Sequence, residues 1–172
     1  MVVRFLFFVL SPLPNDKPCN IFFFYRRNLK TIIVFTREMV RKVFNVPSGE
    51  KEVELLTRND QCELHSMYHK NGRALIAHTI KVLEDAKNND VEMINRSWAL
   101  LCLATVLCPG TGNMVPLECL KILLDMDKVT VYAWDEHILS VAMKEVKICQ
   151  EKTKLQLNSS FWVGGCFPML AV

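Results

Sequence analysis

Three residues with the spacing of metal ligands stand in one short stretch of the chain. Cys62, His65 and His69 follow a Cys-x-x-His-x-x-x-His pattern, and the two histidines share one face if the segment is helical. A structural zinc site normally uses four protein ligands, and the Cys-x-x-Cys half that would complete such a site is missing. We therefore expect no metal ion here and interpret these side chains as polar groups near a loop.

The segment from Cys108 to Asn113 invites comparison with a phosphate-binding loop, because it contains two glycines in the order Cys-Pro-Gly-Thr-Gly-Asn. A phosphate loop places Lys and then Ser or Thr after its last Gly, since the Lys meets phosphate and the hydroxyl meets magnesium. Asn113 and Met114 occupy those two positions here. The sequence therefore predicts a turn between helices, and we expect no nucleotide, no other cofactor and no small-molecule ligand.

Nucleophilic catalysis would need a thiol, a base and an orienting group brought together in space. No two cysteines have Cys-x-x-Cys spacing, and no local signature of a catalytic residue surrounds Cys166 or His137. Several cysteines lie in apolar helical patterns, which is typical of reduced, buried thiols in an intracellular compartment. We therefore expect no catalytic residue and no enzymatic activity. The cysteines are Cys19, Cys62, Cys102, Cys108, Cys119, Cys149 and Cys166.

A basic stretch with interleaved aromatic residues lies over residues 26–42. Such a stretch can contact the phosphates of a nucleic acid, although it is more often a solvated face. The whole chain has 21 Lys and Arg against 18 Asp and Glu, and its net charge of +3 is too small to argue for nucleic acid alone. A nuclear nucleic-acid-binding module is therefore kept as an alternative. Its phosphate contacts would be Arg26, Arg27, Lys30, Arg37, Arg41 and Lys42.

Apolar periodicity and end signals predict the elements that would position these groups. Two apolar runs, residues 21–25 and 31–35, suit short strands and could pair as a hairpin. Thr36 is a helix N-cap, Asn45 ends that helix, and Asp90 caps a later one. The fold class is mainly α, with at most a short strand pair or hairpin near the N-terminus. A short edge strand is allowed over residues 52–55, and further helices are predicted over residues 71–86, 91–108, 115–126 and 131–152.

The same periodicity predicts which helix faces point inward. The segment from Trp98 to Leu107 is apolar on nearly every side, so we expect it to be the most buried helix. The helix before it has one apolar face, which consists of Leu75, Ile76, Ile80, Leu83 and Ala86.

The length of 172 residues and the hydrophobic fraction of 51% fit one globular domain and exclude a disordered chain. Eight of the ten Phe residues fall at or before Phe44, and Pro12, Pro14 and Pro18 interrupt the first apolar runs. We therefore expect residues 1–30 to be a poorly packed extension or a gene-model artefact. Residues 31–172 would form an α-rich domain that is truncated at its C-terminus. No apolar run reaches the roughly 20 residues of a membrane span, so we expect no membrane association.

Three segments together resemble the aminotransferase-like plant mobile domain. Thr36 to Gly49 resembles its helix followed by a Pro-x-Gly turn, Ser97 to Pro109 its apolar central helix, and Phe161 to Cys166 its later Gly-containing helix. The resemblance implies a mainly helical plant protein that derives from a transposable element. In that family the domain often precedes a ubiquitin-like-protein-specific cysteine protease domain. The His, Asp and Cys of that protease have no match here, so no catalytic residue carries over.

These observations favour a non-enzymatic interaction domain of a plant transposable-element-derived protein, with an unknown protein partner. We expect an intracellular location, and a nuclear one is left open. The nucleic-acid-binding module that uses residues 26–42 is one alternative. A remnant of a cysteine-protease-containing protein is the other.

Overall fold

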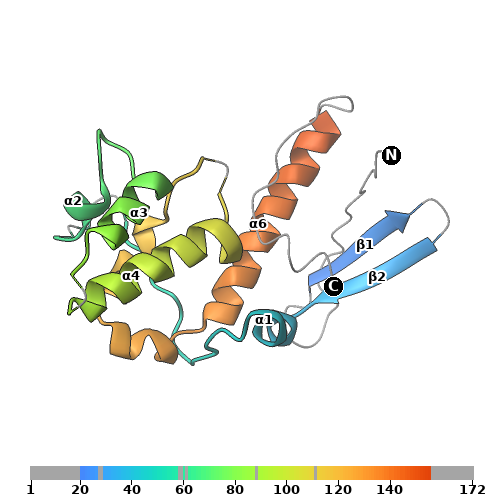
Figure 1. The fold of residues 1–172 in the computed structure, drawn as a ribbon. Helices are drawn as coiled ribbons and strands as arrows, with labels where there is room; N and C mark the ends of the chain where they lie inside the picture. Colours follow the sequence, from blue (N-terminus) through green and yellow to red (C-terminus); the bar gives the residue numbers. More distant parts are fainter. Residues whose placement is uncertain are drawn as a thin grey trace.

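The computed structural model describes residues 20–26, 29–57, 60, 62–87, 89–110 and 112–155, and helices make up most of this part of the chain (Figure 1). This confirms the predicted fold class. The helices α2, α3 and α4 lie together on one side of the long helix α6, while the single hairpin lies on the other side. The described helices are not long and apolar enough to cross a membrane.

The hairpin consists of β1 (Asn20–Arg26) and β2 (Leu29–Phe35), which pair antiparallel from Asn20 opposite Phe35 to Arg26 opposite Leu29. The hairpin that the sequence allowed for these two apolar runs is therefore present, with Ile21 opposite Val34. The predicted boundary between residues 30 and 31 falls inside β2. Residues 1–19 lie outside the described part of the chain, and the small contribution of residues 1–30 to stability stays a prediction.

Helix α1 (Arg37–Phe44) begins and ends as the sequence predicts. The Thr36 side chain accepts a hydrogen bond from the Met39 amide at 3.2 Å, which satisfies one of the free N–H groups of the first turn. Asn45 ends the helix with φ of 51°, a left-handed conformation that Asn tolerates better than most residues.

The remaining helices differ in length from the prediction. Asp90 caps α4 as expected, with its carboxylate accepting from the Met93 amide at 3.1 Å. The predicted helix over residues 115–126 is instead two short turns, and a separate 3-10 segment follows it. The elements are α2 (His65–Tyr68), α3 (Ile76–Glu84), α4 (Val91–Cys102), the π-helical η1 (Leu103–Leu107), the 3-10 turn η2 (Leu117–Cys119), α5 (Leu120–Leu123), the 3-10 segment η3 (Met126–Val131) and α6 (Trp134–Leu155).

A buried arginine holds the end of α5 against α4. The Arg96 side chain donates to the carbonyl oxygens of Leu123 at 2.8 Å and Leu124 at 3.3 Å. These carbonyls stand at a helix end, where no intrahelical donor reaches them. Arg96 therefore replaces the missing backbone bonds and places α5 beside the inner side of α4.

Gly49 allows the chain after α1 to lie directly on the segment before α6. A Cβ at this position would stand 2.1 Å from the carbonyl carbon of Val131, so a larger residue would force the two backbones apart. The Gly49 amide donates to the Tyr132 carbonyl at 3.0 Å, and the Lys51 amide donates to Val131 at 3.0 Å. Backbone bridges at Ser48 and Lys51 thus take the place of the strand expected over residues 52–55.

Buried side chains form two clusters. The larger one includes Tyr68, Leu100, Leu120 and Trp134 and lies among α2, α4, α5 and the start of α6. The smaller one joins β2, α1 and α6, and it consists of Phe35, Val40, Ile138, Leu139, Met143 and Val146.

Two predicted burial patterns are wrong. In α3, Ile80 is 41% exposed and Thr79 is buried instead, because the Thr79 hydroxyl bonds to the Leu75 carbonyl and needs no water. In α4, Leu100 and Leu101 are buried, but Trp98 is 56% exposed and Val106 of η1 is 40% exposed. The segment from Trp98 to Leu107 therefore covers the core with one side only.

Asp135, in the first turn of α6, joins three elements through its buried carboxylate. Arg37 of α1 donates to its two oxygens at 3.0 and 3.2 Å, and the Ser48 hydroxyl donates at 2.6 Å. The residue is only 1% exposed. Burial by itself would raise the pKa of the Asp135 carboxyl, but the bonds from Arg37, Ser48 and the Glu136 amide outweigh it and hold that pKa below its ordinary value.

Replacing Asp135 with Asn should destabilise the fold, because Arg37 and Ser48 would lose their charged acceptor in a buried place. We expect Asp135→Asn to lower the free energy of unfolding by about 2 kcal/mol, which is a fall in Tm of about 5 °C for a chain of this size. Thermal unfolding followed by circular dichroism measures this. Glu38→Gln is the matched control, because it breaks the exposed ion pair with Lys42 and should leave Tm unchanged. Equal effects of the two substitutions would contradict the assignment.

Candidate functional site

The outer side of α4 and η1 is an apolar surface that no described residue covers. Val91, Trp98, Cys102 and Val106 are all exposed, and they follow one another at spacings of seven, four and four residues, which place them along one line of the helix. Asn95 lies on the same line and carries no charge. We call these five residues the α4 face. An exposed, mainly apolar strip without charged side chains is typical of a protein interaction site.

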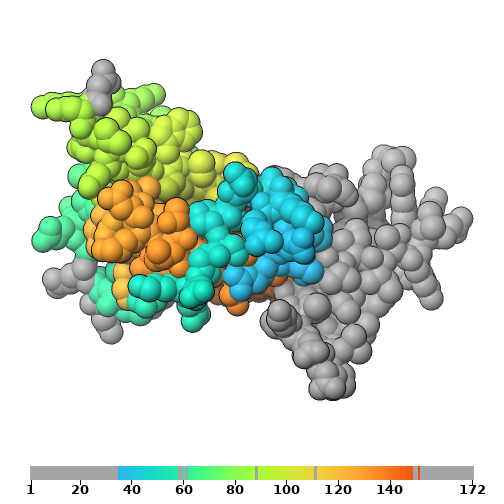
Figure 2. Space-filling model, turned by 90° about the horizontal axis from the view of Figure 1, so that it is seen from below, coloured from blue at the N-terminus to red at the C-terminus, as the bar shows by residue number. Residues whose placement is uncertain are grey.

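An apolar hollow of about 120 Å³ lies beside the α4 face. Ala99 and Cys102 link it to the face, and no polar side chain lines it. Figure 2 shows the segment of η2, α5 and η3 (orange) packed against α4 (yellow-green), with the segment after α1 (teal) beside it. The lining residues come from these segments and from α6: Val46, Pro47, Ala99, Cys102, Leu103, Leu107, Leu123, Val129 and Trp134.

The π-helical turn η1 contributes Val106, the last residue of the α4 face. The Thr105 hydroxyl donates to the Leu101 carbonyl at 2.7 Å, so a side chain bonds to a carbonyl that normally accepts from a backbone amide of the helix. The Cys108 amide then bonds to the Leu103 carbonyl five residues earlier, at 2.8 Å. Such widened turns are rare and occur often at functional sites. Here the wider turn places Val106 on the outer surface and Leu107 in the hollow.

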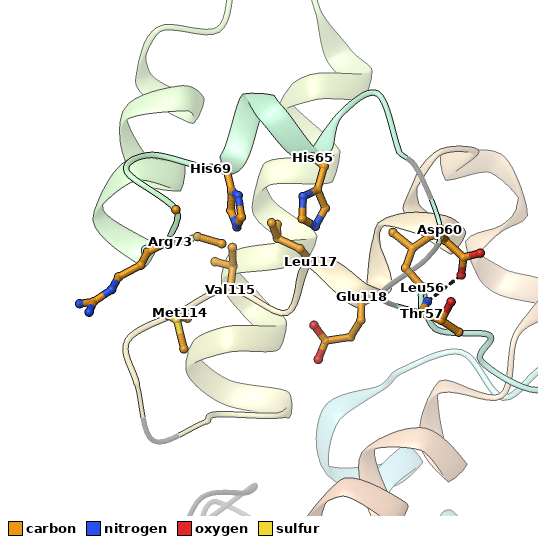
Figure 3. A pocket seen from close by; sticks show the side chains of 12 residues that line it. Leu56, Thr57, Asp60, His65, His69, Arg73, Met114, Val115, Leu117 and Glu118 are labelled. Atoms are coloured by element: carbon orange, nitrogen blue, oxygen red, sulfur yellow. Dashed lines mark hydrogen bonds between the residues drawn. The ribbon is translucent and has the colours of Figure 1, made fainter.

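A second candidate is an open pocket of about 480 Å³ below α2, drawn in Figure 3. His65 begins α2 and His69 directly follows it. The rings of both point into this pocket, with their centroids 4.7 Å apart. Glu118 stands across from them, whereas the Arg73 guanidinium points away. The apolar lining includes Leu117. The pocket offers hydrogen-bonding groups over an apolar floor, and its described lining contains no cysteine or serine.

The structure separates Cys62 from the two histidines that share its sequence pattern. Cys62 packs against the larger core cluster, whereas His65 and His69 line the pocket. Among the described residues, no group of three or more His, Cys, Asp or Glu side chains is placed to hold a metal ion. The expectation that no metal or small-molecule ligand binds here stays a prediction.

The loop from Cys108 to Asn113 forms a backbone hydrogen bond with the start of α3. The Asn113 carbonyl accepts from the Ile76 amide at 3.0 Å at the start of α3, and the Val115 amide donates to Ala74 at 2.8 Å. Asn113 adopts φ of 50°, which fits a turn. The described part of this loop therefore leads from η1 toward η2, and its backbone bonds to the start of α3 on the way.

Two of the basic residues in the stretch 26–42 are paired with carboxylates. Arg37 is engaged with Asp135 and with Glu136 at 3.1 Å, and Lys42 pairs with Glu38 at 2.8 Å. Arg41 is exposed. The backbones of Arg26 and Lys30 lie in β1 and β2, and Arg27 lies outside the described residues, as does the segment from Phe161 to Cys166.

Cys119 is a poor candidate for a nucleophile. Burial raises the pKa of its thiol strongly, and the neighbouring Glu118 raises it further. The reactive form of cysteine is the thiolate, so this residue stays in its inert form at neutral pH. Cys102 is the exposed thiol of the described residues, and it has apolar neighbours on the α4 face.

Comparison with known proteins gives one match. A family model described as "Domain of unknown function (DUF8566)" covers residues 26–171. No curated protein and no solved structure matches the chain.

His137 carries a pH-dependent contribution to stability close to the pocket. Burial lowers the pKa of its imidazole, and the Glu118 carboxylate opposes this only in part. As pH falls below about 6.5, the ordinary pKa of His, His137 therefore binds a proton in the unfolded chain more readily than in the folded chain. Folding stability should decrease as pH falls from 7 to 5.

In His137→Gln this decrease should be shallower, because the group that titrates is gone. Chemical denaturation at pH 5, 6 and 7 measures the slope. His69→Gln removes an exposed histidine and serves as the control, with a slope like that of the wild type. If His137→Gln also keeps the wild-type slope, another group causes the pH dependence.

Proposed function

Because the chain belongs to the DUF8566 family, a domain of unknown function, we propose its function from its surface: a non-enzymatic interaction domain that binds a protein partner. The α4 face and the hollow beside it form the binding site. The single observation that carries this proposal is the exposure of Trp98 and Val106 on a helix whose other side packs the core.

The chemistry of this site suits another protein. Trp is the residue type most often responsible for a large share of binding energy, because its ring buries a wide area and loses little conformational freedom. The apolar hollow would receive an aliphatic or aromatic side chain of the partner. Covering apolar surface yields about 25 cal/mol per Å² before the costs of association. An amphipathic helix laid along α4 would satisfy both parts of the site.

The pocket and the thiols support a non-catalytic role. Among the described lining residues, the histidines of the pocket have no cysteine or serine beside them, and the buried Cys119 thiol stays protonated at neutral pH. The alternative that the chain is a remnant of a cysteine-protease-containing protein would be favoured if a cysteine-directed protease probe labelled the folded chain at a single residue.

The second alternative is a nuclear nucleic-acid-binding module that uses residues 26–42. The exposed Arg41 favours it, but the ion pairs of Arg37 and Lys42 reduce the positive charge that phosphates would meet. Binding of duplex DNA that weakens steeply with salt and is lost in Arg41→Ala would favour this alternative over a protein partner.

We also propose that the domain derives from a plant transposable element. The support is the resemblance of Thr36–Gly49 and Ser97–Pro109 to the aminotransferase-like plant mobile domain. Sequencing of transcripts across the locus tests it. We expect flanking sequence of a mobile element, such as an adjoining ubiquitin-like-protein-specific protease domain, and a locus free of any element-derived sequence would contradict the proposal.

A displayed library of random 16-residue peptides, selected on the immobilised full-length chain, tests the α4 face. We expect the selected peptides to carry apolar residues at i, i+3 or i+4, and i+7. Trp98→Asp should raise their dissociation constants at least about 10-fold, which corresponds to about 1.4 kcal/mol, because it places a charge where apolar contact is needed.

Met114→Asp is the matched control for that experiment. Met114 is 50% exposed, close to the 56% of Trp98, but it lines the histidine pocket. The control should bind the selected peptides like the wild type. If the selected peptides bind Trp98→Asp as tightly as the wild type, the α4 face is not the docking site.

A further inference from the structure

The α4 face carries a projecting side chain and a hollow side by side. Trp98 stands out from the helix with more than half of its surface exposed, and the next residue, Ala99, already lines the hollow. Cys102, one turn further along, belongs to both the face and the hollow. A surface with a knob and a hole of the same apolar character is complementary to a copy of itself when the copy is turned by a two-fold axis.

We propose that the protein forms a two-fold symmetric dimer through the α4 face, with each Trp98 inserted into the hollow of the other copy. This inference rests on the proposed function, because it names a second copy of the chain as the partner of the same surface. A foreign partner would have to supply both a projecting apolar side chain and an apolar recess at matching positions. A second copy already has both.

The register of the dimer follows from helix geometry. A two-fold axis perpendicular to α4 at the level of Leu100 pairs the two α4 helices antiparallel. A residue a given number of positions before Leu100 then faces the residue the same number of positions after Leu100 in the partner. Trp98 faces Cys102 of the partner subunit, which lines the hollow. Val106 faces the partner's Ile94.

The charge pattern permits this arrangement. From Asn95 to Val106, Arg96 is the one charged residue, and it is buried and turned toward α5. The nearest exposed charge on α4 is Glu92, at the start of the helix. In an antiparallel pair the two Glu92 side chains stand at opposite ends of the interface, so like charges do not meet across the axis.

The apolar residues of the face are exposed enough to form the centre of an interface. Val91 is 59% exposed, Trp98 56% and Val106 40%, and the Cys102 thiol is exposed as well. A stable dimer buries about 800 Å² on each partner, with an apolar core and a polar rim. The α4 face would supply that core, and the polar residues around α4 would supply the rim.

Light scattering coupled to size-exclusion chromatography of the full-length chain tests the proposal. We expect the wild type at tens of micromolar to have twice the chain mass of 19.8 kDa. Trp98→Asp should have the mass of one chain, with its dimer dissociation constant raised at least 100-fold, and Met114→Asp should remain a dimer. Circular dichroism melts of both variants verify that they are folded.

A crosslink reports the register directly. In the proposed dimer the two Cys102 residues are shifted by four residues, about 6 Å, along helices whose axes are about 9 Å apart. Because each Cα lies about 2.3 Å from its own axis on the side toward the partner, the two Cα atoms are about 7 to 8 Å apart. This is at the limit of the reach of a disulfide, about 7 Å, and a short bis-maleimide spans it. Mass spectrometry of the crosslinked wild type should therefore show a peptide that joins the two Cys102 residues, and Cys102→Ser should lack it.

The possible results separate this inference from the proposed function. A wild type that stays monomeric at several hundred micromolar overturns the dimer, while peptides that depend on Trp98 would still support a docking face. A dimer that persists in Trp98→Asp, or one without the Cys102 crosslink, overturns the dimer interface. Loss of the dimer in folded Trp98→Asp together with that crosslink supports it.

Discussion

The buried carboxylate of Asp135 is the interaction on which the arrangement of this domain depends. Arg37 and Ser48 come from parts of the chain 98 and 87 residues away from it, and both bond to its oxygens. A charge in this position is tolerated only when its partners are present, because leaving it unpaired costs several kcal/mol. Helix α1, the turn at Ser48 and the start of α6 must therefore come together in one arrangement. Val46, Pro47 and Trp134 then become neighbouring walls of the hollow.

The inner side of α4 is fixed by a second set of long-range bonds. Arg96 holds the carbonyl ends of α5, and the Ser97 hydroxyl lies 3.0 Å from the hydroxyl of the buried Tyr68. Together with Leu100 and Leu101, these contacts use the whole side of the helix that faces the core. The orientation of α4 about its own axis is thereby set, and Trp98 has to point outward.

The local features of the fold could be predicted from the sequence, because short-range chemistry determines them. Thr36, Asn45 and Asp90 act as caps through bonds to residues three or four positions away. The two apolar runs close together in the chain likewise indicated the hairpin, but its register differs by one residue from a pairing of residues 21–25 with residues 31–35, because β1 and β2 extend to Arg26 and Leu29. The long-range bonds of Asp135 to Arg37 and of Arg96 to Leu123 span 98 and 27 residues. The apolar periodicity of the sequence does not indicate such distant partners.

Burial was predicted less well, for a physical reason that α3 and α4 share. The apolar pattern of α3 pointed to Ile80, but Thr79 is buried because its hydroxyl is satisfied by its own helix. In α4 the pattern is apolar on all sides, so it could not tell the covered side from the exposed one. The one available signal was weak: Asn95 and Thr105, the uncharged polar residues of this segment outside the core, lie close to the line of Trp98.

Within the part of the chain that the structure describes, no packing contact accounts for the apolar character of the α4 face. Leu100, Leu101, Leu103 and Ala104 already supply the core contacts of this segment. A polar residue at the position of Trp98 would leave those contacts intact and would be better solvated. An exposed single hydrophobic residue needs no cause, but a line of them beside an apolar hollow is the arrangement that a binding surface requires. The same residues that made the segment look like the centre of the fold are thus best understood as the centre of an interface.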